Sequence, residues 1–544
     1  MEFLRLLRSE SAINLRRMFG MAVIAGLSNA MILAVINAAA SPSAQAAGKA
    51  RMAIMFVTVL IAFTISQRYL MFEASKEIER IIHRVRSRLT AAVRDSELAD
   101  IEHIGRTRIF NAISKEIQAL AQNTNTLVAV TQMSLLVVFA TLYLLVLSPT
   151  AFAIAIVFMS VAIAIYLGRL KTVGKAIQDS IGAELSLHEL LEGILDGFKE
   201  VKLNATRSQQ ISDDLLEASL DAAESRVTAQ SELTRNYVFT QNVFFLLLAV
   251  MVFVIPLLTD IAGETVVKLT TAILFVTSAI AGVVSSVPVF INANASAANI
   301  MTLQRLIGAP PRLLSESTRL VVDPSAFGRI DVRDVSFSYG DAGNPGFRVG
   351  PFTTSFKAGE TVFISGGNGS GKSTFMRLFT SLYWPRDGYI ALDGAPVTHE
   401  NVENYRALFT SVFSEYHLFK KLYGVPPEAV AEIPELLALF EIEDKTALID
   451  GAFTTVNLSA GQRKRVALIV ALLERRPICV LDEWAADQDP LFRRKFYEDL
   501  LPIFKARGIT VIAVSHDDRY FHVADRRLHF EEGRIVSDVR SSEA

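Results

Sequence analysis

The sequence predicts a chain in two parts, an α-helical membrane domain followed by an α/β domain. Hydrophobic residues make up 51% of the 544 residues, and several apolar runs before residue 300 reach the ~20 residues that a helix needs to cross a bilayer. Beyond residue 330, strand-like runs alternate with helical ones, the pattern of an α/β domain. A glycine-rich stretch at residues 366–374, between one such strand and helix, marks this second part as a P-loop nucleotide-binding domain.

The charge and the cysteine content exclude several kinds of protein. The formal net charge is −2, which gives no electrostatic basis for binding nucleic acid. The one cysteine, Cys479, excludes an intrachain disulfide and a metal site built from several cysteines. It lies in the apolar run 478–481, so we expect a buried and unreactive thiol.

The N-terminal segment has two interpretations. Residues 1–17 place arginines among leucine, isoleucine and phenylalanine, an amphipathic pattern suited to a membrane surface. The apolar run 18–40 that follows is long enough for a first membrane span. A cleavable signal peptide is the alternative, because residues 43–46 are rich in small side chains. The apolar run is longer than the roughly 7–15 residues of a signal's apolar region, so we expect an uncleaved span.

Further apolar runs bring the number of predicted spans to six. They are residues 53–72, 127–147, 151–167, 237–258 and 267–290. The long segments 73–126 and 168–236 are rich in arginine and lysine, and the positive-inside rule assigns them to the cytoplasm. Because an even number of spans returns the chain to its starting side, we expect a multi-pass membrane protein with cytoplasmic N- and C-termini. The predicted membrane domain covers residues 1–300.

The two long segments between the spans keep a helical period, as in the stripe formed by Ile78, Ile81 and Val85. We therefore expect the spans to continue as long cytoplasmic helical extensions. The turns between these helices, residues 97–109 and 198–207, are short and mixed in polarity, as suits docking on another domain. A solvated charged surface is the alternative interpretation of these turns.

The apolar period fades after residue 300, where prolines 310, 311 and 324 indicate a linker over residues 301–329. The α/β domain then covers residues 330–544. Its predicted strands are residues 330–339, 361–365, 389–392, 477–482 and 509–515.

The residues of the glycine-rich stretch fit the phosphate-binding loop pattern in a strand-loop-helix context. They are Gly366, Gly367, Asn368, Gly369, Ser370, Gly371, Lys372, Ser373 and Thr374. Glycines let consecutive backbone N–H groups turn toward a polyphosphate, and the next helix adds the positive end of its dipole. We expect Lys372 to reach the β and γ phosphates and the Ser373 hydroxyl to ligate Mg²⁺.

Paired carboxylates end a second apolar strand. Asp482, at the end of the run 478–482, is predicted to hold the water shell of Mg²⁺, and Glu483 to orient or deprotonate the attacking water. His516 follows the strand 509–515 and is predicted to contact the γ-phosphate. We therefore expect Lys372, Glu483 and His516 to be the catalytic residues.

With the segment Leu458-Ser459-Ala460-Gly461-Gln462 before the carboxylates, the sequence resembles the ATP-binding cassette (ABC) superfamily. The six spans make the whole chain similar to an ABC exporter half-transporter with the type I exporter fold. The resemblance implies that ATP and Mg²⁺ bind and that two cassettes close head to tail. Each ATP would lie between one chain's phosphate loop and residues 458–462 of a second copy, so the active unit would be a homodimer.

The resemblance also implies roles for single residues. Tyr339 would stack on adenine. Ser459 and Gly461 would bind the γ-phosphate of the ATP held by the other chain, and Ala460 and Gln462 belong to the same binding segment. Asp487 would be the acidic residue of the loop after the carboxylates, and His516 would be the switch histidine.

One position departs from the superfamily pattern. Ser414 stands where a glutamine that helps to ligate Mg²⁺ is expected, and a serine would leave water to complete the metal's shell. Glu415 is either a substitute for the glutamine or a surface residue that meets the membrane domain. Residues 420–457 are short for the superfamily's helical subdomain, with little room for a long helix before Glu428.

Residues 409–419, 458–465 and 481–490 resemble the cyclic-peptide and siderophore exporter branch. Members of that branch move pyoverdine precursors, syringomycin-type lipopeptides and lasso microcins out of the bacterial cytoplasm. The resemblance implies ATP-driven export of a cyclic or modified peptide, with a siderophore as one possible cargo, across the bacterial inner membrane. In the membrane half it rests on residues 195–204.

Other functions remain open from the sequence. They are an exporter-fold siderophore importer, a lipid flippase, and a nucleotide-gated channel or regulatory membrane protein. Amides in or beside the spans are candidates for substrate contact, with helix-to-helix hydrogen bonding as the alternative. They are Asn29, Asn37, Gln132, Gln241, Asn242, Asn292 and Asn294.

Overall fold

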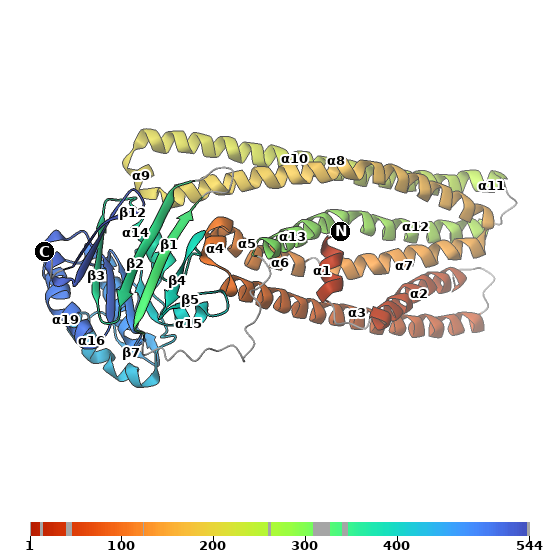
Figure 1. Cartoon of the computed structure of the whole chain (residues 1–544). Helices are drawn as coiled ribbons and strands as arrows, with labels where there is room; N and C mark the ends of the chain where they lie inside the picture. The colour runs from red at the N-terminus through yellow and green to blue at the C-terminus, as the bar shows by residue number, and fades with distance from the viewer. Residues whose placement is uncertain are drawn as a thin grey trace. The chain divides into compact units, whose positions relative to one another are not determined.

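The computed structural model of the chain describes residues 2–10, 15–39, 46–122, 124–258, 263–307, 327–339 and 346–540. It divides into two compact units, shown in Figure 1. The first comprises Met1–Arg94 and Ile104–Gly308, and the second Asp95–His103 and Ala309–Ala544. The small residues at 43–45 and the three prolines of the predicted linker lie outside the described residues.

The first unit is helical, and six of its helical stretches are long and apolar enough to cross a membrane. They are Arg17–Ala39, Gly48–Asp95, Val128–Leu147, Pro149–Asp196, Ala205–Leu257 and Gly263–Leu306. Four of these six stretches exceed 40 residues, whereas a span needs ~20. The prediction of six spans, with helices that continue well beyond them, is confirmed.

The elements of this unit follow one another with short turns. They are α1 (Glu2–Glu10), α2 (Leu15–Ala39), α3 (Ala46–Asp95), α5 (Arg106–Asn111), α6 (Ile117–Gln122), α7 (Thr124–Leu147), α8 (Pro149–Asp196), α9 (Phe198–Leu203), α10 (Ala205–Ala249), α11 (Ile255–Leu258), α12 (Gly263–Ser285) and α13 (Val287–Leu306). Single π-helical turns occur at Ala112–Glu116 and Val250–Val254.

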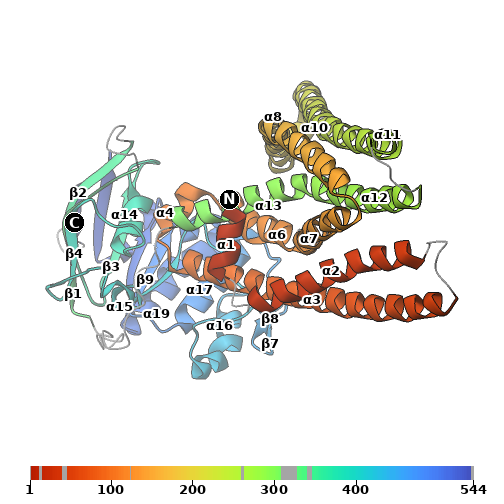
Figure 2. The ribbon, with the colours of Figure 1, turned by 90° about the vertical axis from the view of Figure 1, so that its right-hand side faces the viewer.

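Helix α7 lies at the centre of the bundle, in contact with α2, α8 and α12. Small residues allow the close approaches. A Cβ at Gly26 of α2 would meet Leu135 of α7 at 2.8 Å, and one at Gly282 of α12 would meet Met133 at 2.2 Å. Helices α8 and α10 run side by side, as Figures 1 and 2 show, and α9 joins them (Figure 1).

Helix α1 buries its apolar side against the protein. Phe3 and Leu6 are each 3% exposed, the ring of Phe3 meets that of Phe290 edge-on, and the backbone N–H of Phe3 donates to Oδ1 of Asn294 at 3.3 Å. The sequence favoured a helix lying on the membrane surface. The described apolar side chains of α1 pack against α13, and the position of α1 at a membrane surface stays a prediction.

The second unit contains two main sheets. The larger one has the strand order β12-β11-β3-β10-β9-β6, and the smaller antiparallel one has the order β2-β1-β4-β5. The strands are β1 (Arg329–Ser338), β2 (Arg348–Lys357), β3 (Thr361–Gly366), β4 (Asp387–Leu392), β5 (Ala395–Pro396), β6 (Phe409–Val412), β7 (Leu448–Ile449), β8 (Ala452–Phe453), β9 (Ile478–Asp482), β10 (Thr510–Val514), β11 (Arg526–Glu531) and β12 (Arg534–Arg540). The helices are α14 (Lys372–Phe379), α15 (Val402–Arg406), α16 (Ile433–Leu439), α17 (Ala460–Leu473), α18 (Pro490–Lys495) and α19 (Leu501–Ala506).

The central strands of the larger sheet are parallel. Strand β10 pairs in parallel with β3 and β9, and β6 pairs in parallel with β9. Because every residue of β9 and β10 is buried, these strands read as continuous apolar runs, typical of a parallel sheet covered on both faces. The carboxyl ends of β3, β10, β9 and β6 therefore meet at one edge.

The second unit includes the first predicted docking turn. Leu98 and Ala99 of α4 (Leu98–Ile104) pack against the core of the α/β domain. Arg406 donates to Glu97 at 2.8 Å, and Tyr383 donates to Glu102. Residues 97–103 thus dock on the domain, as expected. Docking of the second turn, residues 198–207, which contains α9, stays a prediction.

Arg526 joins three strands of the domain. It is 4% exposed, and its guanidinium donates to both carboxylate oxygens of Asp538 at 2.6 and 2.5 Å. It also donates to the carbonyl oxygen of Ser355 at 2.5 Å and to Oγ1 of Thr354 at 2.7 Å. One buried cation therefore connects β11, β12 and β2.

We expect Arg526→Met to lower the thermal unfolding midpoint of the purified protein's α/β domain. The substitution leaves Asp538 and a buried carbonyl without their donor, a loss of about 2 kcal/mol, or roughly 4–8 °C. Arg534→Met on β12 is the control, because that side chain is exposed. Equal midpoints for the two variants, measured by differential scanning calorimetry, would show that Arg526 does not hold these strands together.

Candidate nucleotide-binding site

The phosphate-binding loop connects the end of β3 to the start of α14. Strand β3 is buried apart from its last residue, and Gly371, with φ of 96°, caps the helix. The Lys372 ammonium donates to the carbonyl oxygens of Gly366 at 3.0 Å and Gly367 at 2.8 Å, which closes the loop into a cradle. Gly367, Asn368 and Gly369 are exposed at its rim.

Two glycines of the loop tolerate no side chain. Gly366 has φ of 144°, and a Cβ there would lie 2.2 Å from the carbonyl oxygen of Phe530. A Cβ at Gly371 would lie 2.9 Å from Cγ1 of Val349, at a φ that favours glycine. The tight course of the loop thus follows from β11 and β2 pressing against it.

The paired carboxylates lie close enough to the loop to act on its lysine. Burial lowers the pKa of the Lys372 ammonium, and the charges of Glu483 and Asp482 raise it in part, so that the pKa is lowered overall. The structure therefore brings together Lys372, the first residue of α14, and the two carboxylates at the end of β9, as the sequence predicted.

Asp482 has an oxygen that no described residue satisfies. The side chain is 2% exposed, and its Oδ1 is buried without a hydrogen-bond partner among the described residues. Such an oxygen is costly unless a cation or its water shell reaches it. With the half-buried Ser373 in the first turn of α14, the available donors are the hard oxygens that Mg²⁺ prefers, so these residues fit the metal. When it is bound together with the nucleotide, Mg²⁺ would neutralise part of the negative charge on the phosphates.

Ser414 occupies the position expected of the superfamily's glutamine. It follows β6, and its Oγ donates to Oδ2 of Asp482 at 3.2 Å. A serine can therefore reach the carboxylate directly, although it is too short to extend past it. Glu415 is exposed, which favours the surface interpretation of that residue.

Glu483 and His516 form a pair at the same edge. Nε2 of His516 lies 3.0 Å from Oε1 of Glu483. Glu483 has φ of 50°, a conformation unusual for a non-glycine residue, and Lys464 donates to its backbone oxygen at 2.9 Å. Strained backbone of this kind is found where surrounding contacts hold a functional side chain in place.

Tyr339 lies beside the loop. Its hydroxyl is 2.8 Å from Oγ1 of the buried Thr374, and its ring is 51% exposed. Phe337 meets the ring edge-on at 5.2 Å and Tyr383 at 6.0 Å. These contacts fix the plane of an exposed aromatic ring next to the phosphate cradle, which is compatible with stacking on a base.

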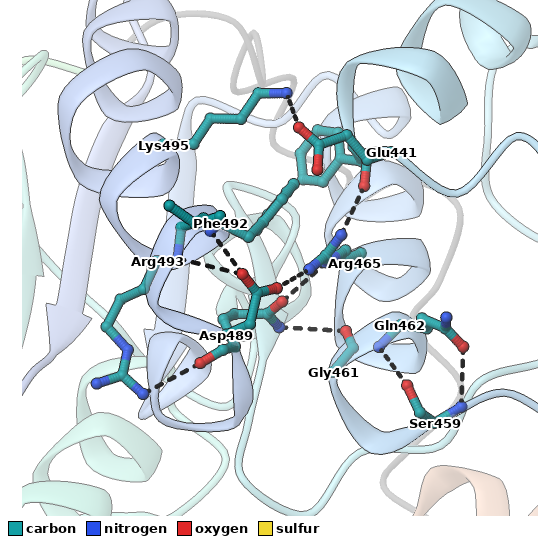
Figure 3. A network of polar contacts seen from close by, with 12 residues as sticks. Glu441, Ser459, Gly461, Gln462, Arg465, Asp489, Phe492, Arg493 and Lys495 are labelled. Atoms are coloured by element: carbon teal, nitrogen blue, oxygen red, sulfur yellow. Dashed lines mark hydrogen bonds and ion pairs between the residues drawn. The ribbon is translucent and has the colours of Figure 1, made fainter.

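Residues 459–462 form the N-terminus of α17 (Figure 3). The backbone N–H of Gln462 donates to Ser459 Oγ at 3.3 Å, and the backbone N–H of Ser459 donates to Gln462 Oε1 at 3.2 Å. This capping box orients a 14-residue helix whose positive end is marked by the exposed Ser459 and Ala460. A Cβ at Gly461 would meet the carbonyl oxygen of Asp487 at 2.6 Å.

No hydrogen bond among the described residues joins this helix end to its own chain's phosphate loop. Among the described residues its side-chain hydrogen bonds remain local or come from Gln488, which donates to the oxygen of Gly461 at 3.1 Å. Lys464 forms an ion pair with Asp487 at 2.8 Å. The predicted residues thus separate into one group around the loop and a second group, Ser459 to Gln462 with Asp487, that faces outward.

The sequence interpretation missed the residues that support the second group. Arg465 donates to Gln488 at 2.9 Å and to Asp489 at 2.7 Å, and it stacks on the ring of Phe492 at 3.5 Å, as Figure 3 shows. A signal existed for Lys464, which shares an apolar stripe of α17 with Leu468 and is 4% exposed. A lysine on such a stripe indicates a buried charge with a partner.

A complete phosphate-binding cradle beside paired carboxylates, joined to six membrane helices, defines an ATPase-driven membrane transporter. The ABC transporter family's sequence profile matches residues 349–486. The chain is 34% identical to ATP-binding protein SyrD of Pseudomonas syringae pv. syringae over 476 residues, 85% of this chain and 83% of SyrD. The chain belongs to the ABC transporter family, and its nucleotide-binding domain hydrolyses ATP to power transport.

Two further similarities concern the fold and the range of related transporters. The structure of a bacterial Atm1-family ABC exporter with ATP bound aligns with a TM-score of 0.76 at 17% identity, covering 98% of this chain and 96% of that one. The ABC exporter fold predicted from the sequence is therefore confirmed. An ATP-dependent lipid A-core flippase of Burkholderia orbicola (strain AU 1054) is 32% identical, over 39% of this chain and 37% of the flippase.

We expect Glu483→Gln to bind ATP normally but to lose nearly all turnover. The substitution keeps the size and the hydrogen-bonding reach of the side chain and removes its ability to accept a proton. Phosphate release and nucleotide binding are measured on the same reconstituted sample. Phosphate release at the wild-type rate would contradict the assignment of Glu483 as the general base.

We expect Ser414→Ala to reduce ATPase activity only about two- to fivefold. One hydrogen bond to Asp482 is lost, worth about 0.5–1.5 kcal/mol, and water can replace the hydroxyl. Lys372→Ala is the reference for a severe loss. If both substitutions reduced the steady-state rate equally, Ser414 would have a larger part in the site than its geometry indicates.

Proposed function

We propose that the chain forms a homodimer that uses ATP to export a cyclic or modified peptide, such as a siderophore or its precursor, across the bacterial inner membrane. The observation that carries this proposal is the similarity to SyrD along both domains. An alignment of 476 residues is far longer than the segment 330–544, so it includes much of the membrane half. The cargo comes from the resemblance of the cassette motifs to the cyclic-peptide and siderophore exporter branch.

The proposed domains and orientation follow the sequence. The membrane domain is residues 1–300, the linker 301–329 and the ATP-binding domain 330–544. The arginine- and lysine-rich extensions favour cytoplasmic N- and C-termini, because positive residues remain on that side.

In the proposed hydrolysis step, Glu483 accepts a proton from the attacking water while His516 holds the carboxylate in position. The supporting observation is their 3.0 Å contact at the carboxyl end of the sheet. Lys372, released from the carbonyl oxygens that it contacts in the cradle, would bind the β and γ phosphates. Asp482, Ser373 and, through its contact with Asp482, Ser414 would hold Mg²⁺ and its waters. Tyr339 would stack on adenine.

The dimer is supported by the separation of the two residue groups. The N-terminus of α17 presents a positive helix end with exposed residues, which suits an anion such as the γ-phosphate. Since its hydrogen bonds within the described chain reach Gln488 and not the loop, a second copy would bring Ser459 and Gly461 to the ATP held by Lys372.

Lipid flipping is the second candidate function. The flippase similarity favours it, but that alignment spans 230 residues, about the length of the ATP-binding domain. The channel alternative has weaker support, because a general base is present here and a channel needs none. The importer alternative is distinguished by the direction of transport.

We expect a cyclic peptide or peptide siderophore to stimulate the ATPase of the dimer reconstituted in vesicles and to accumulate inside vesicles whose ATP-binding domains face outward. Glu483→Gln is the control that binds but does not transport. A fluorescent phospholipid in the same vesicles tests the flippase alternative. Stimulation by lipid alone, or movement of peptide in the opposite direction, would contradict peptide export.

A further inference from the structure

Lys464 is a buried lysine of α17 whose side chain ends at the turn that carries Glu483. The residue is only 4% exposed. Its ammonium donates to the backbone oxygen of Glu483 at 2.9 Å and lies 2.8 Å from Oδ2 of Asp487. A buried ammonium costs free energy unless such partners receive it, so both contacts fix its position. The side chain therefore joins α17 to both ends of the turn 483–487.

Further contacts hold the same turn against α17. The indole Nε1 of Trp484, a residue that is 1% exposed, donates to the backbone oxygen of Lys464 at 2.8 Å. Gly461 lies three residues before Lys464, on the same side of the helix. A Cβ at Gly461 would meet the backbone oxygen of Asp487 at 2.6 Å. Lys464 thus contacts the backbone of the turn and the turn contacts the backbone of Lys464, which fixes the turn relative to the helix.

Glu483 begins this turn in a backbone conformation that is strained for a glutamate. Its φ and ψ are 50° and 35°, in the left-handed region that favours glycine. Its backbone oxygen also accepts from the N–H of Ala486 at 3.3 Å, a longer contact than the one from Lys464. The glutamate side chain is 38% exposed and has a 3.0 Å contact with Nε2 of His516. Apart from that contact, the direction of the carboxylate follows from the backbone that carries it.

We propose that Lys464 is a positioning residue for ATP hydrolysis, which holds the backbone of Glu483 so that the carboxylate points at the attacking water. The direction in which a side chain leaves the backbone is set by φ and ψ, so a small relaxation of the turn would move the carboxylate away from that water. The inference rests on the proposed hydrolysis step, in which Glu483 is the general base. Lys464 acts on the reaction only through Glu483.

Lys464→Met removes the ammonium and keeps a long side chain. The variant is expected to fold, because the Glu483 oxygen keeps the N–H of Ala486 and the carboxylate of Asp487, at 48% exposure, is reached by water. In the reconstituted full-length protein we expect kcat for phosphate release to fall about ten- to a hundredfold, with little change in the KM for ATP. Wild-type kcat, or a higher KM with kcat unchanged, would overturn the proposal.

Lys495→Met is the matched control. Lys495 of α18 also forms an ion pair, with Glu441 at 2.6 Å (Figure 3), and its other contact is with the ring of Phe492. We expect this variant to keep kcat within about twofold of wild type, because a partly exposed ion pair contributes little. An equal loss in both variants would overturn the assignment. If Lys464→Met folds poorly, Lys464→Gln repeats the test, because its amide ends one bond short of the ammonium. Wild-type kcat in that variant would also overturn the proposal.

Adding Lys464→Met to Glu483→Gln separates positioning from a merely structural role. A residue that acts only through Glu483 has nothing left to position once the base is removed, so the two losses are not additive. We expect Glu483→Gln to hydrolyse ATP at the same single-turnover rate with and without Lys464→Met. A further fall by the factor that Lys464→Met causes alone would show that Lys464 acts elsewhere, and would overturn the proposal.

The same measurements distinguish the failure of this inference from the failure of the hydrolysis step on which it rests. Phosphate release at the wild-type rate from Glu483→Gln would overturn the general base, and this inference with it. Loss of turnover in Glu483→Gln together with wild-type turnover in Lys464→Met would overturn the role of Lys464 alone.

Discussion

The site depends on one constraint, the parallel pairing of β3, β10, β9 and β6. Parallel strands place their carboxyl ends at one edge, and each end here carries one part of the chemistry. The phosphate loop follows β3, His516 follows β10, the carboxylates end β9 and Ser414 follows β6. Residues between positions 414 and 516 are thereby brought within contact distance, as the bonds of Asp482 to Ser414 and of Glu483 to His516 demonstrate.

Two buried polar groups at the same edge have no hydrogen-bond partner among the described residues. The buried Oδ1 of Asp482 and the buried hydroxyl of Ser370 lack partners among the described residues. A folded protein retains such groups only where they have a use, because each costs free energy that packing elsewhere must offset. ATP with Mg²⁺ would supply the missing contacts. Binding then favours whichever conformation completes them, and this differential affinity is how ATP would drive a conformational change.

Docking of residues 97–103 shows how the α/β domain holds a segment of the membrane half. Glu102 accepts from Tyr383, whose ring stacks on Phe337 and lies edge-on to Tyr339. Arg377 of α14 forms an ion pair with Glu102 at 3.5 Å. A short path of packed aromatic rings and one ion pair therefore connects the neighbourhood of the phosphate loop to the turn at the end of the long helix α3.

Much of this was predictable because the signals are local. A span is visible from its length and apolarity, and β3, β9 and β10 from their apolar runs. Strands β2, β6, β11 and β12 and the two-residue strands β5, β7 and β8 were not predicted. In β11, for example, the polar residues Arg526 and His529 interrupt the alternation. The contact of Ser414 with Asp482 joins residues 68 positions apart, so only the sheet order reveals it. The cavity of about 260 Å³ lined by residues of α7, α8, α10, α12 and α13 depends on how five helices pack, which no single segment of the sequence encodes.

In the proposed dimer each ATP site is completed by a second copy of the chain, and cross-linking of two single-cysteine variants tests this arrangement most directly. Cys479 is buried and its pKa is raised to about 12 by burial, so it stays unreactive. Asn368→Cys and Ala460→Cys, each in the Glu483→Gln background, are mixed and treated with a short bis-maleimide. We expect a cross-linked dimer of the two variants with ATP and Mg²⁺ and little without them. No cross-link with ATP, or the same yield without nucleotide, would contradict it.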